Sequence, residues 1–234
     1  MTSVQPNADS IRDLFDRIAP VYDDLNQSLS LGLHRVWKQM AVRWSGAQPG
    51  MTCLDLCCGS GDLALLLARQ VGPQGQVTGA DFAVAQLAIA RQRAAQQRLR
   101  QIDWIEADAL ALPFETAQFE AATMGYGLRN LTDIPQGLTE LCRVLKPGAT
   151  AAVLDFHQPQ QVWIQQFQQW YLQAVVVPAA ERCGLTEEYA YIGPSVERFP
   201  NGSEQVALAQ QVGFANAVHY PLLGGMMGVL VATK

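Results

Sequence analysis

Basic residues are few in this sequence. The 16 Lys and Arg are outnumbered by 21 Asp and Glu, and the formal net charge is −5. Proteins that hold nucleic acid gain affinity by neutralising backbone phosphates, so this charge balance argues against a nucleic-acid partner.

Long apolar runs and a secretion signal are also missing. No stretch reaches the roughly 18 apolar residues that cross a bilayer, and the opening MTSVQPNADS has no basic segment followed by an apolar one. We therefore expect a cytoplasmic protein, with transient contact at a membrane surface left open.

Cysteine supplies neither a disulfide framework nor a zinc site. The five cysteines are odd in number, form no CxxC pair and have no histidines at matching spacing, so we expect no bound metal. They are Cys53, Cys57, Cys58, Cys142 and Cys183.

What the chain does contain is an alternation of short apolar runs and helical patterns. Hydrophobic residues make up 49% of the 234 residues, enough for one sizeable core. Buried parallel strands are predicted at 51–58, 76–81, 101–108, 119–126 and 149–156, with helical spacing between them. Leu138, Leu141, Cys142 and Leu145 make one such helical stripe. This order is typical of an α/β fold of the Rossmann type.

The two ends of the chain differ from this repeat. Residues 218–221 and 226–233 read as two strands joined by a Gly-rich stretch too short for a crossover helix, so they should pair antiparallel. Near the start, the spacing of Ile11, Leu14, Phe15 and Ile18 suggests helix. We predict an N-terminal helical cap over 1–45 and one cofactor-binding domain over 46–234. The oligomeric state stays open, a homodimer included.

A glycine turn follows the first predicted strand. Gly59, Ser60 and Gly61 come directly after the strand that carries Asp55, and a helical pattern begins at once. Strand, glycine turn and helix form a nucleotide-site geometry, because glycine lets the backbone approach a ligand closely.

Acids end three neighbouring strands. Asp55 lies near the end of the first, Asp81 closes the second about 20 residues beyond the glycine turn, and Asp108 closes the third. An acid at the Asp81 spacing can accept both hydroxyls of an adenosine ribose. The alternative for a single Asp is a helix cap, but three acids at the ends of three successive strands argue against a chance arrangement.

The glycine motif also fits a dinucleotide enzyme, and an NAD-dependent oxidoreductase stays open as a rival. Asp55 and Asp62 flank the turn, however, and two carboxylates would repel a pyrophosphate. They would attract the ammonium and sulfonium of S-adenosylmethionine, which favours that cofactor.

Several motifs resemble one known family. LDLCCGSGD, GADF, ADALALPF, MGYGLRN and RVLKPGA are similar to segments of the quinone-biosynthesis C-methyltransferases, as are YDDLNQSLSLGLHRVWK and EYAYIGPSVERFPN nearer the ends. Within that family, CCGSGD, MGYGLRN and VVVPAA resemble the phylloquinone branch of photosynthetic organisms. The resemblance implies a Rossmann-like class I methyltransferase with a seven-stranded, mostly parallel sheet, an antiparallel last strand and helices on both faces.

The resemblance also implies cofactor-binding residues. It assigns S-adenosylmethionine to Ser60, Asp81 and the pair Asp108 and Ala109, the last two at the adenine. Some relatives place a further Ser where this chain has Gly125, so that contact would have to come from backbone. Together with the residues argued above, the cofactor set is Asp55, Gly59, Ser60, Gly61, Asp81, Phe82, Asp108, Ala109 and Gly125.

A sulfonium is already an activated methyl donor, so the acceptor sets the chemical problem. A quinol ring becomes a carbon nucleophile when one hydroxyl loses its proton, and a cation would stabilise that state. Arg129, just after the fourth strand, is the candidate clamp, with a salt bridge to Asp133 or another acid as the alternative. His34 and His157 are the candidate bases, with a structural role open for each.

Aromatic and amide side chains are candidates for the acceptor pocket, although aromatic residues are more often simply core. The substrate-side candidates are Tyr22, Asn26, Tyr126, Asn130, Tyr189 and Tyr191. Trp163, Phe167, Trp170 and Tyr171 lie at helical spacing and could wall a channel for a prenyl tail, or pack on the sheet.

We therefore predict S-adenosylmethionine-dependent C-methylation of a hydrophobic prenylated quinol, demethylphylloquinol first. A menaquinol or ubiquinol precursor and small-molecule O-methylation are alternatives in the same class. From other classes, the NAD-dependent oxidoreductase and a catalytically silent S-adenosylmethionine-binding module stay open.

Overall fold

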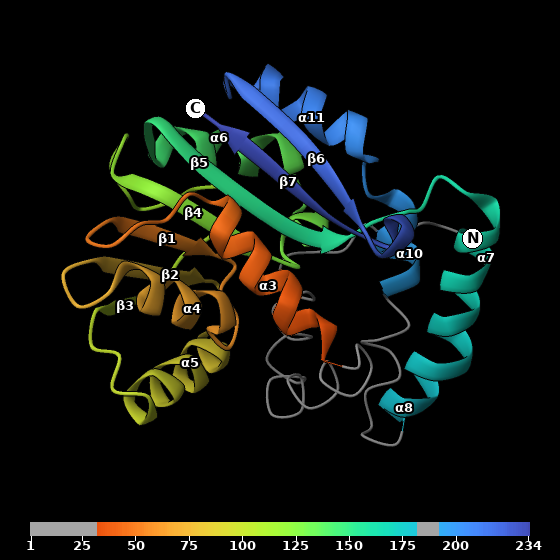
Figure 1. Cartoon of the computed structure of the whole chain (residues 1–234), viewed down its shortest axis with the longest axis horizontal. Helices are drawn as coiled ribbons and strands as arrows, with labels where there is room; N and C mark the ends of the chain where they lie inside the picture. The colour runs from red at the N-terminus through yellow and green to blue at the C-terminus, as the bar shows by residue number, and fades with distance from the viewer. Residues whose placement is uncertain (1–31, 182–191) are drawn as a thin grey trace.

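The computed structural model describes residues 32–181 and 192–234, apart from the side chains of residues 179 and 180. Its centre is a seven-stranded sheet in the order β3-β2-β1-β4-β5-β7-β6 (Figure 1). The strands are β1 Thr52–Leu56, β2 Gln76–Asp81, β3 Ile102–Glu106, β4 Phe119–Gly125, β5 Leu145–Phe156, β6 Asn216–Leu222 and β7 Met227–Thr233. All seven predicted strands are confirmed.

Strand β7 alone runs against its neighbours. It pairs antiparallel with both β5 and β6, whereas β1, β2, β3, β4 and β5 pair in parallel. The short η3 turn, Leu223–Gly225, joins β6 to β7. The predicted antiparallel pair and the predicted Rossmann-like class I fold are therefore confirmed.

Helices cover both faces of the sheet (Figure 1). The bounds are α3 Leu33–Trp44, α4 Asp62–Val71, α5 Val84–Gln96, η1 Leu128–Asn130, α6 Ile134–Val144, α7 Val162–Tyr171, η2 Leu172–Val176, α8 Val177–Glu181, α10 Ile192–Arg198 and α11 Gly202–Gln211. One stripe was predicted too long: helix α6 ends at Val144, and Leu145 opens β5 opposite Phe119 because its backbone is extended.

The core has two halves that the sheet separates. Leu54 and Leu56 point into one half with residues of α6 and α11, whereas Cys53, just before Leu54, points into the other with residues of α3 and α4. This alternation is the period-two pattern of a strand buried on both faces. Burial raises the pKa of the Cys53 thiol to about 12, so this cysteine acts as a small apolar core residue.

The described part of the N-terminal segment belongs to this core. Helix α3 packs against α4 and β5, and its Ala41 and Val42 are buried there. The residues that predicted a helix earlier in the segment, Ile11 to Ile18, lie outside the described residues. Within the two described ranges, no helix is both long and apolar enough to cross a membrane, and no group of metal-binding side chains gathers.

Candidate functional site

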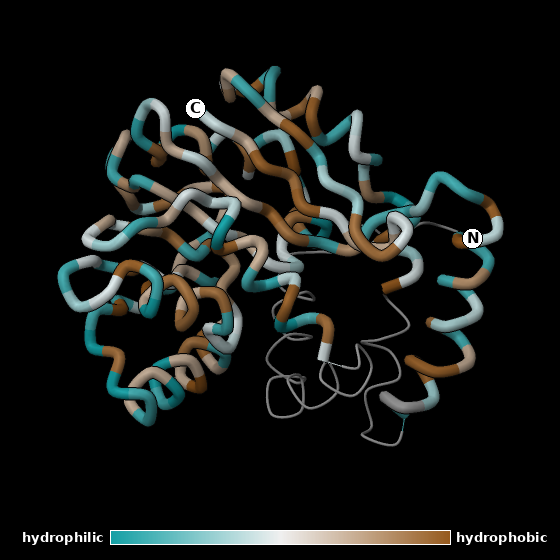
Figure 2. Tube along the Cα trace, in the orientation of Figure 1, coloured by the Kyte–Doolittle hydropathy of each residue, from teal (hydrophilic) through white to brown (hydrophobic). Residues whose placement is uncertain are grey.

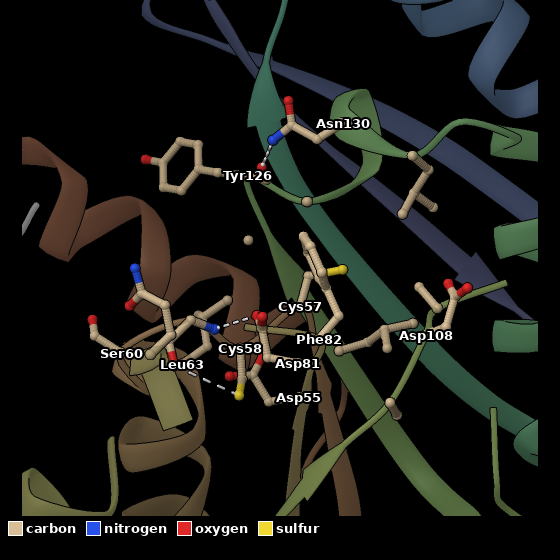
Figure 3. Close-up of a pocket in the computed structure, with 18 of the residues that line it drawn as sticks. Asp55, Cys57, Cys58, Ser60, Leu63, Asp81, Phe82, Asp108, Tyr126 and Asn130 are labelled. Carbon is tan, nitrogen blue, oxygen red and sulfur yellow. Dashed lines mark hydrogen bonds between the residues drawn. The ribbon is translucent and has the colours of Figure 1, made fainter. Parts of the chain in front are cut away.

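A cavity opens at the carboxyl ends of β1, β2 and β4, where open α/β sheets hold their ligands. Asp55, Asp81 and Asp108 all line it, so the three strand-end acids share one cleft as predicted. Figure 3 shows Asp55 and Asp81 close together, with Tyr126 and Asn130 across the cavity. The other predicted residues on its wall are Gly59, Ser60, Phe82, Ala109 and Gly125.

The glycine turn is shaped by two positions that only glycine fills easily. Gly59 and Gly61 have φ values of 52° and 89°, in the left-handed region. A Cβ on Gly61 would lie 2.7 Å from the Trp104 ring. The turn therefore packs tightly on β3 and places the start of α4, at Asp62, over the cavity.

Asp81 holds the glycine turn in place through its side chain. Its Oδ2 accepts the Gly59 backbone N–H at 2.8 Å, and its Oδ1 accepts the N–H of Ala83 at 2.9 Å. Asp81 also lines the cavity, and carboxylate oxygens are the acceptors that the two hydroxyls of a ribose require. Asp81 is thus both a brace for the turn and a fitting partner for a ribose diol.

Asp55 is completely buried, with no exposed surface. Its Oδ1 accepts the Thr123 hydroxyl at 2.8 Å, while Oδ2 has no hydrogen-bond partner among the described residues. Burial raises the pKa of Asp55 to about 7, despite the hydrogen bond from Thr123 that favours the charged form. A buried carboxylate with one unpartnered oxygen, beside a ligand cavity, fits an ammonium donor, as the amino-acid tail of S-adenosylmethionine would supply.

Asp62 is not the open anion that the sequence suggested. The Lys38 ammonium bonds its Oδ2, and Arg93 bonds its Oδ1 at 2.5 Å. Burial alone would raise the pKa of Asp62, but the charges of Lys38 and Arg93 outweigh it and lower the pKa to about 2. The carboxylate is therefore ionised and neutralised within the protein, so it does not face a sulfonium as a free charge.

Lys38 and Arg93 were missed in the sequence. Lys38 ends the YDDLNQSLSLGLHRVWK motif, so a signal for it existed, whereas nothing local marks Arg93. Lys38 is 5% exposed and lines the cavity. Arg93 donates to both the carbonyl and the hydroxyl of Ser60 at 2.9 Å, which fixes the second residue of the turn.

The far end of the cavity is less polar. Asp108 is exposed, and its Oδ1 accepts the Leu110 N–H at 2.9 Å. Ala109 is buried beside it, and Phe82 lines the same cavity. A flat aromatic group with polar edges would fit between these side chains.

Gly125 has a steric reason to be glycine. A Cβ at this position would come within 2.8 Å of Leu63 Cδ1, although that atom is the end of a flexible side chain. A serine here would therefore have to displace Leu63, so the chain presents backbone at this point of the cavity.

Arg129 does not face the cavity as a free cation. Its Nη1 bonds Asp155 at 2.5 Å, and both side chains are nearly fully buried. The guanidinium also donates to the Tyr126 carbonyl and lies over Phe156, 5.0 Å from the ring centre. The salt-bridge alternative holds in this structure, with Asp155 as the acid and not Asp133.

The two histidine candidates also lie away from the cavity wall. His157 packs on His219 with ring centres 4.5 Å apart, and its Nδ1 contacts the Gly225 carbonyl at 3.2 Å. Burial lowers the pKa of His157, which keeps the ring neutral. His34 is buried on α3 and is absent from the cavity lining.

Tyr126 and Asn130 are the substrate-side candidates that the cavity contains. The Tyr126 backbone is left-handed, with φ 61°, and its carbonyl accepts the Asn130 Nδ2 at 2.9 Å. Asn130 Oδ1 is buried and has no hydrogen-bond partner among the described residues. The four other candidates lie outside the described residues: Tyr22, Asn26, Tyr189 and Tyr191.

Comparison with known proteins identifies a family. A family model described as the ubiE/COQ5 methyltransferase family matches residues 1–234. The 2-phytyl-1,4-naphthoquinone methyltransferase of Trichormus variabilis is 64% identical over 96% of this chain and 98% of its own. The chloroplastic counterpart of Arabidopsis thaliana is 50% identical over 95% of this chain and 87% of its own.

Solved structures agree on the fold. A SAM-dependent methyltransferase from Aquifex aeolicus superimposes with a TM-score of 0.63 at 18% identity, covering 83% of this chain and 88% of its own. A phosphoethanolamine N-methyltransferase from Haemonchus contortus, solved with S-adenosylhomocysteine, gives a TM-score of 0.65 at 15% identity over 96% of this chain and 60% of its own. None of these matches favours the NAD-dependent alternative.

Proposed function

Because the chain belongs to the ubiE/COQ5 methyltransferase family and is an S-adenosylmethionine-dependent methyltransferase, we propose that it methylates a ring carbon of demethylphylloquinol. The observation that carries this choice is the agreement of relatives at 50% to 64% identity, which bear the name 2-phytyl-1,4-naphthoquinone methyltransferase and align over nearly the whole chain. The product would be phylloquinol.

We propose that the cofactor lies along the cavity with its amino-acid tail at the glycine turn. Asp81 would accept the ribose hydroxyls, and Asp108 with Ala109 would meet the adenine. Asp55 would receive the ammonium on its open Oδ2. Bound in this way, the cofactor supplies a methyl group on a positively charged sulfur.

We assign the carboxylate of that tail to Lys38. Lys38 lines the cavity with its ammonium on Asp62, which places a positively charged group at this end of the cavity. The neighbouring Asp55 supplies a negative charge when it ionises. A site with separate negative and positive groups matches a zwitterionic amino acid.

The acceptor would enter from the side of Tyr126 and Asn130. Reduction to the quinol is required because the oxidised ring is electron-poor and cannot act as a nucleophile. The buried and unpartnered Oδ1 of Asn130 would accept one quinol hydroxyl, which would orient the ring and raise the electron density at the reacting carbon. The ring carbon would bond the methyl carbon as the bond from that methyl carbon to sulfur breaks, and the ring carbon would then lose its proton to solvent.

In this proposal Arg129 is a positioning residue. Its bonds to Asp155 and to the Tyr126 carbonyl hold the segment from Tyr126 to Asn130 at the end of β4. Without that ion pair, Asn130 would lose its fixed place on the cavity wall.

A labelled-methyl assay tests the function. The full chain is incubated with S-adenosylmethionine carrying a radioactive methyl group and with detergent-dispersed demethylphylloquinone, with and without a chemical reductant. We expect label in phylloquinol only when the reductant is present. Faster transfer to a demethylmenaquinol or to a ubiquinol precursor would replace our choice of ring, and label in a methyl ether would indicate O-methylation.

A phytyl chain is too apolar to dissolve in water, so the acceptor resides in a bilayer. We propose that the protein approaches a membrane surface from the cytoplasm and binds there transiently.

A further inference from the structure

Helix α7 exposes three aromatic residues, whereas one of its glutamines is buried. Val162, Trp163, Phe167 and Trp170 are 64%, 69%, 47% and 57% exposed, whereas Gln168 is only 8% exposed. A surface helix of a globular protein normally turns its apolar side to the core. We name these three exposed aromatic residues, together with Val162 beside them, the α7 aromatic face.

The orientation of α7 is fixed by contacts at its base. Gln168 donates to the carbonyls of His157 at 3.0 Å and Met226 at 3.3 Å, which ties the helix to the ends of β5 and β7. Ile164, one turn earlier, is buried beside η3. Because the helix cannot roll without breaking these contacts, the exposure of the opposite side is built into the fold.

The exposed rings form one continuous strip. Trp163, Phe167 and Trp170 follow at spacings of four and three residues, which places them along one side of the helix. Phe167 lies 5.8 Å from Trp170 and 6.2 Å from Tyr171, measured between ring centres. Gln166 and Gln169 are exposed as well, so uncharged polar side chains border this strip, and Figure 2 shows hydrophilic and hydrophobic residues interspersed along α7.

Charge is absent from the whole segment. No Asp, Glu, Lys or Arg occurs from Gln158 to Ala180, and the polar residues of α7 itself are all Gln apart from Tyr171. The whole chain carries a net charge of −5. A partner recognised by charge would find nothing here, and an anionic surface would be repelled by the rest of the protein.

We infer that the α7 aromatic face is a docking surface for the interfacial layer of an electrically neutral lipid bilayer. Tryptophan and tyrosine favour this layer because their rings are apolar with one polar edge, and the uncharged, exposed Gln166 and Gln169 beside them suit a helix lying in its plane. Four large side chains are too few for a stable interface with a second copy, which takes roughly 20–30 residues on each side.

The position of α7 in the fold relates the docking surface to the cavity. The helix follows the end of β5, at the edge of the sheet where the cavity opens (Figure 1). A protein seated through this face would bring that edge toward the bilayer in which a prenylated acceptor is dissolved. This use rests on the proposed function, whereas the docking itself does not.

Vesicle flotation of the full chain tests the inference. Vesicles of phosphatidylcholine alone are compared with vesicles containing phosphatidylglycerol, at about 0.1 M and about 1 M salt. We expect binding to pure phosphatidylcholine that salt does not weaken, with the Trp fluorescence shifted to the blue. The double substitution Trp163→Gln and Trp170→Gln should lower the partition coefficient about tenfold or more.

Matched controls keep the test decisive. Val218→Gln and Tyr220→Gln remove exposed apolar side chains from β6 and should leave vesicle binding unchanged. The Trp variants should retain wild-type methylation of a detergent-dispersed acceptor, which shows that they fold. Unchanged vesicle binding in these variants overturns the inference, as does binding that requires anionic lipid or a dimer that the substitutions dissociate. Docking without methylation would contradict only the proposed function, and methylation in detergent without docking would contradict only this inference.

Discussion

The assignment of Lys38 to the cofactor tail yields a sharp prediction for Lys38→Met. S-adenosylhomocysteine and 5′-methylthioadenosine are both neutral thioethers with the same adenosine, and they differ in the amino-acid tail. If Lys38 reads the tail carboxylate, the substitution weakens binding of the first ligand and spares the second.

The expected magnitude follows from the burial of Lys38. Its side chain is only 7% exposed, so water screens the charge weakly. A hydrogen bond to a charged group contributes about 1.5–3 kcal/mol. Because about 1.4 kcal/mol corresponds to a factor of ten, the dissociation constant for S-adenosylhomocysteine should rise about 10- to 100-fold. Asp62 keeps its bond to Arg93, so the substitution leaves no unpaired buried charge.

Titration calorimetry with both ligands decides the matter. Lys146→Met is the matched control, because Lys146 pairs with Glu120 at 3.3 Å on the surface, far from the cavity lining. It should change neither affinity. Equal losses for both ligands in Lys38→Met would mean that Lys38 acts only as a brace between α3 and α4. An unchanged affinity for S-adenosylhomocysteine would remove Lys38 from the tail site.

Further substitutions test Asp81, Asp55 and the ion pair of Arg129 with Asp155. Asp81→Ala should weaken the binding of S-adenosylhomocysteine and of 5′-methylthioadenosine about tenfold or more, since both carry the ribose. An unchanged affinity would exclude Asp81 from the site. Burial raises the pKa of Asp55 to about 7, above an unfolded value of about 3.9. Between these pH values the folded, ligand-free protein therefore holds a proton that the unfolded chain has lost. The contribution of Asp55 to the stability of the fold falls as pH rises through this window. Binding of an ammonium should release this proton; calorimetry near pH 6 in buffers of different ionisation heat should detect about one proton, and none in Asp55→Asn. Arg129→Ala should lower the free energy of unfolding in urea by about 3 kcal/mol, and adding Asp155→Ala should cost little more, whereas additive losses would show that the two charges do not interact.

The features that sequence predicted well are local or periodic. Buried strands such as 76–81 are short apolar runs, and the turn at Gly59 and Gly61 is a contiguous motif. The carboxyl ends of neighbouring parallel strands lie at one edge of the sheet, so acids at those ends are expected to lie close together. Asp55, Asp81 and Asp108 do line one cavity. The antiparallel pairing of β6 and β7 could be predicted because the connection between them is too short for the crossover that parallel strands need.

The features that sequence missed depend on which distant side chains meet. Asp62 was expected to face the cofactor, but its partners lie 24 and 31 residues away on other helices. Arg129 was expected to face the acceptor, but Asp155, 26 residues later, takes its charge. No periodicity encodes such pairs, since they depend on how helices and strands come together.

The amino-acid sequence by itself determined the α/β order, the glycine turn and the strand-end acids, because backbone sterics and residue periodicity act over a few neighbouring positions. Only the tertiary structure decided which charges are free. It paired Asp62 with Lys38 and left one oxygen of Asp55 open, and it turned the rings of α7 outward by anchoring Gln168 to distant backbone carbonyls. Burial and pairing are properties of the packed chain, and they decide what each ionisable or aromatic side chain can bind.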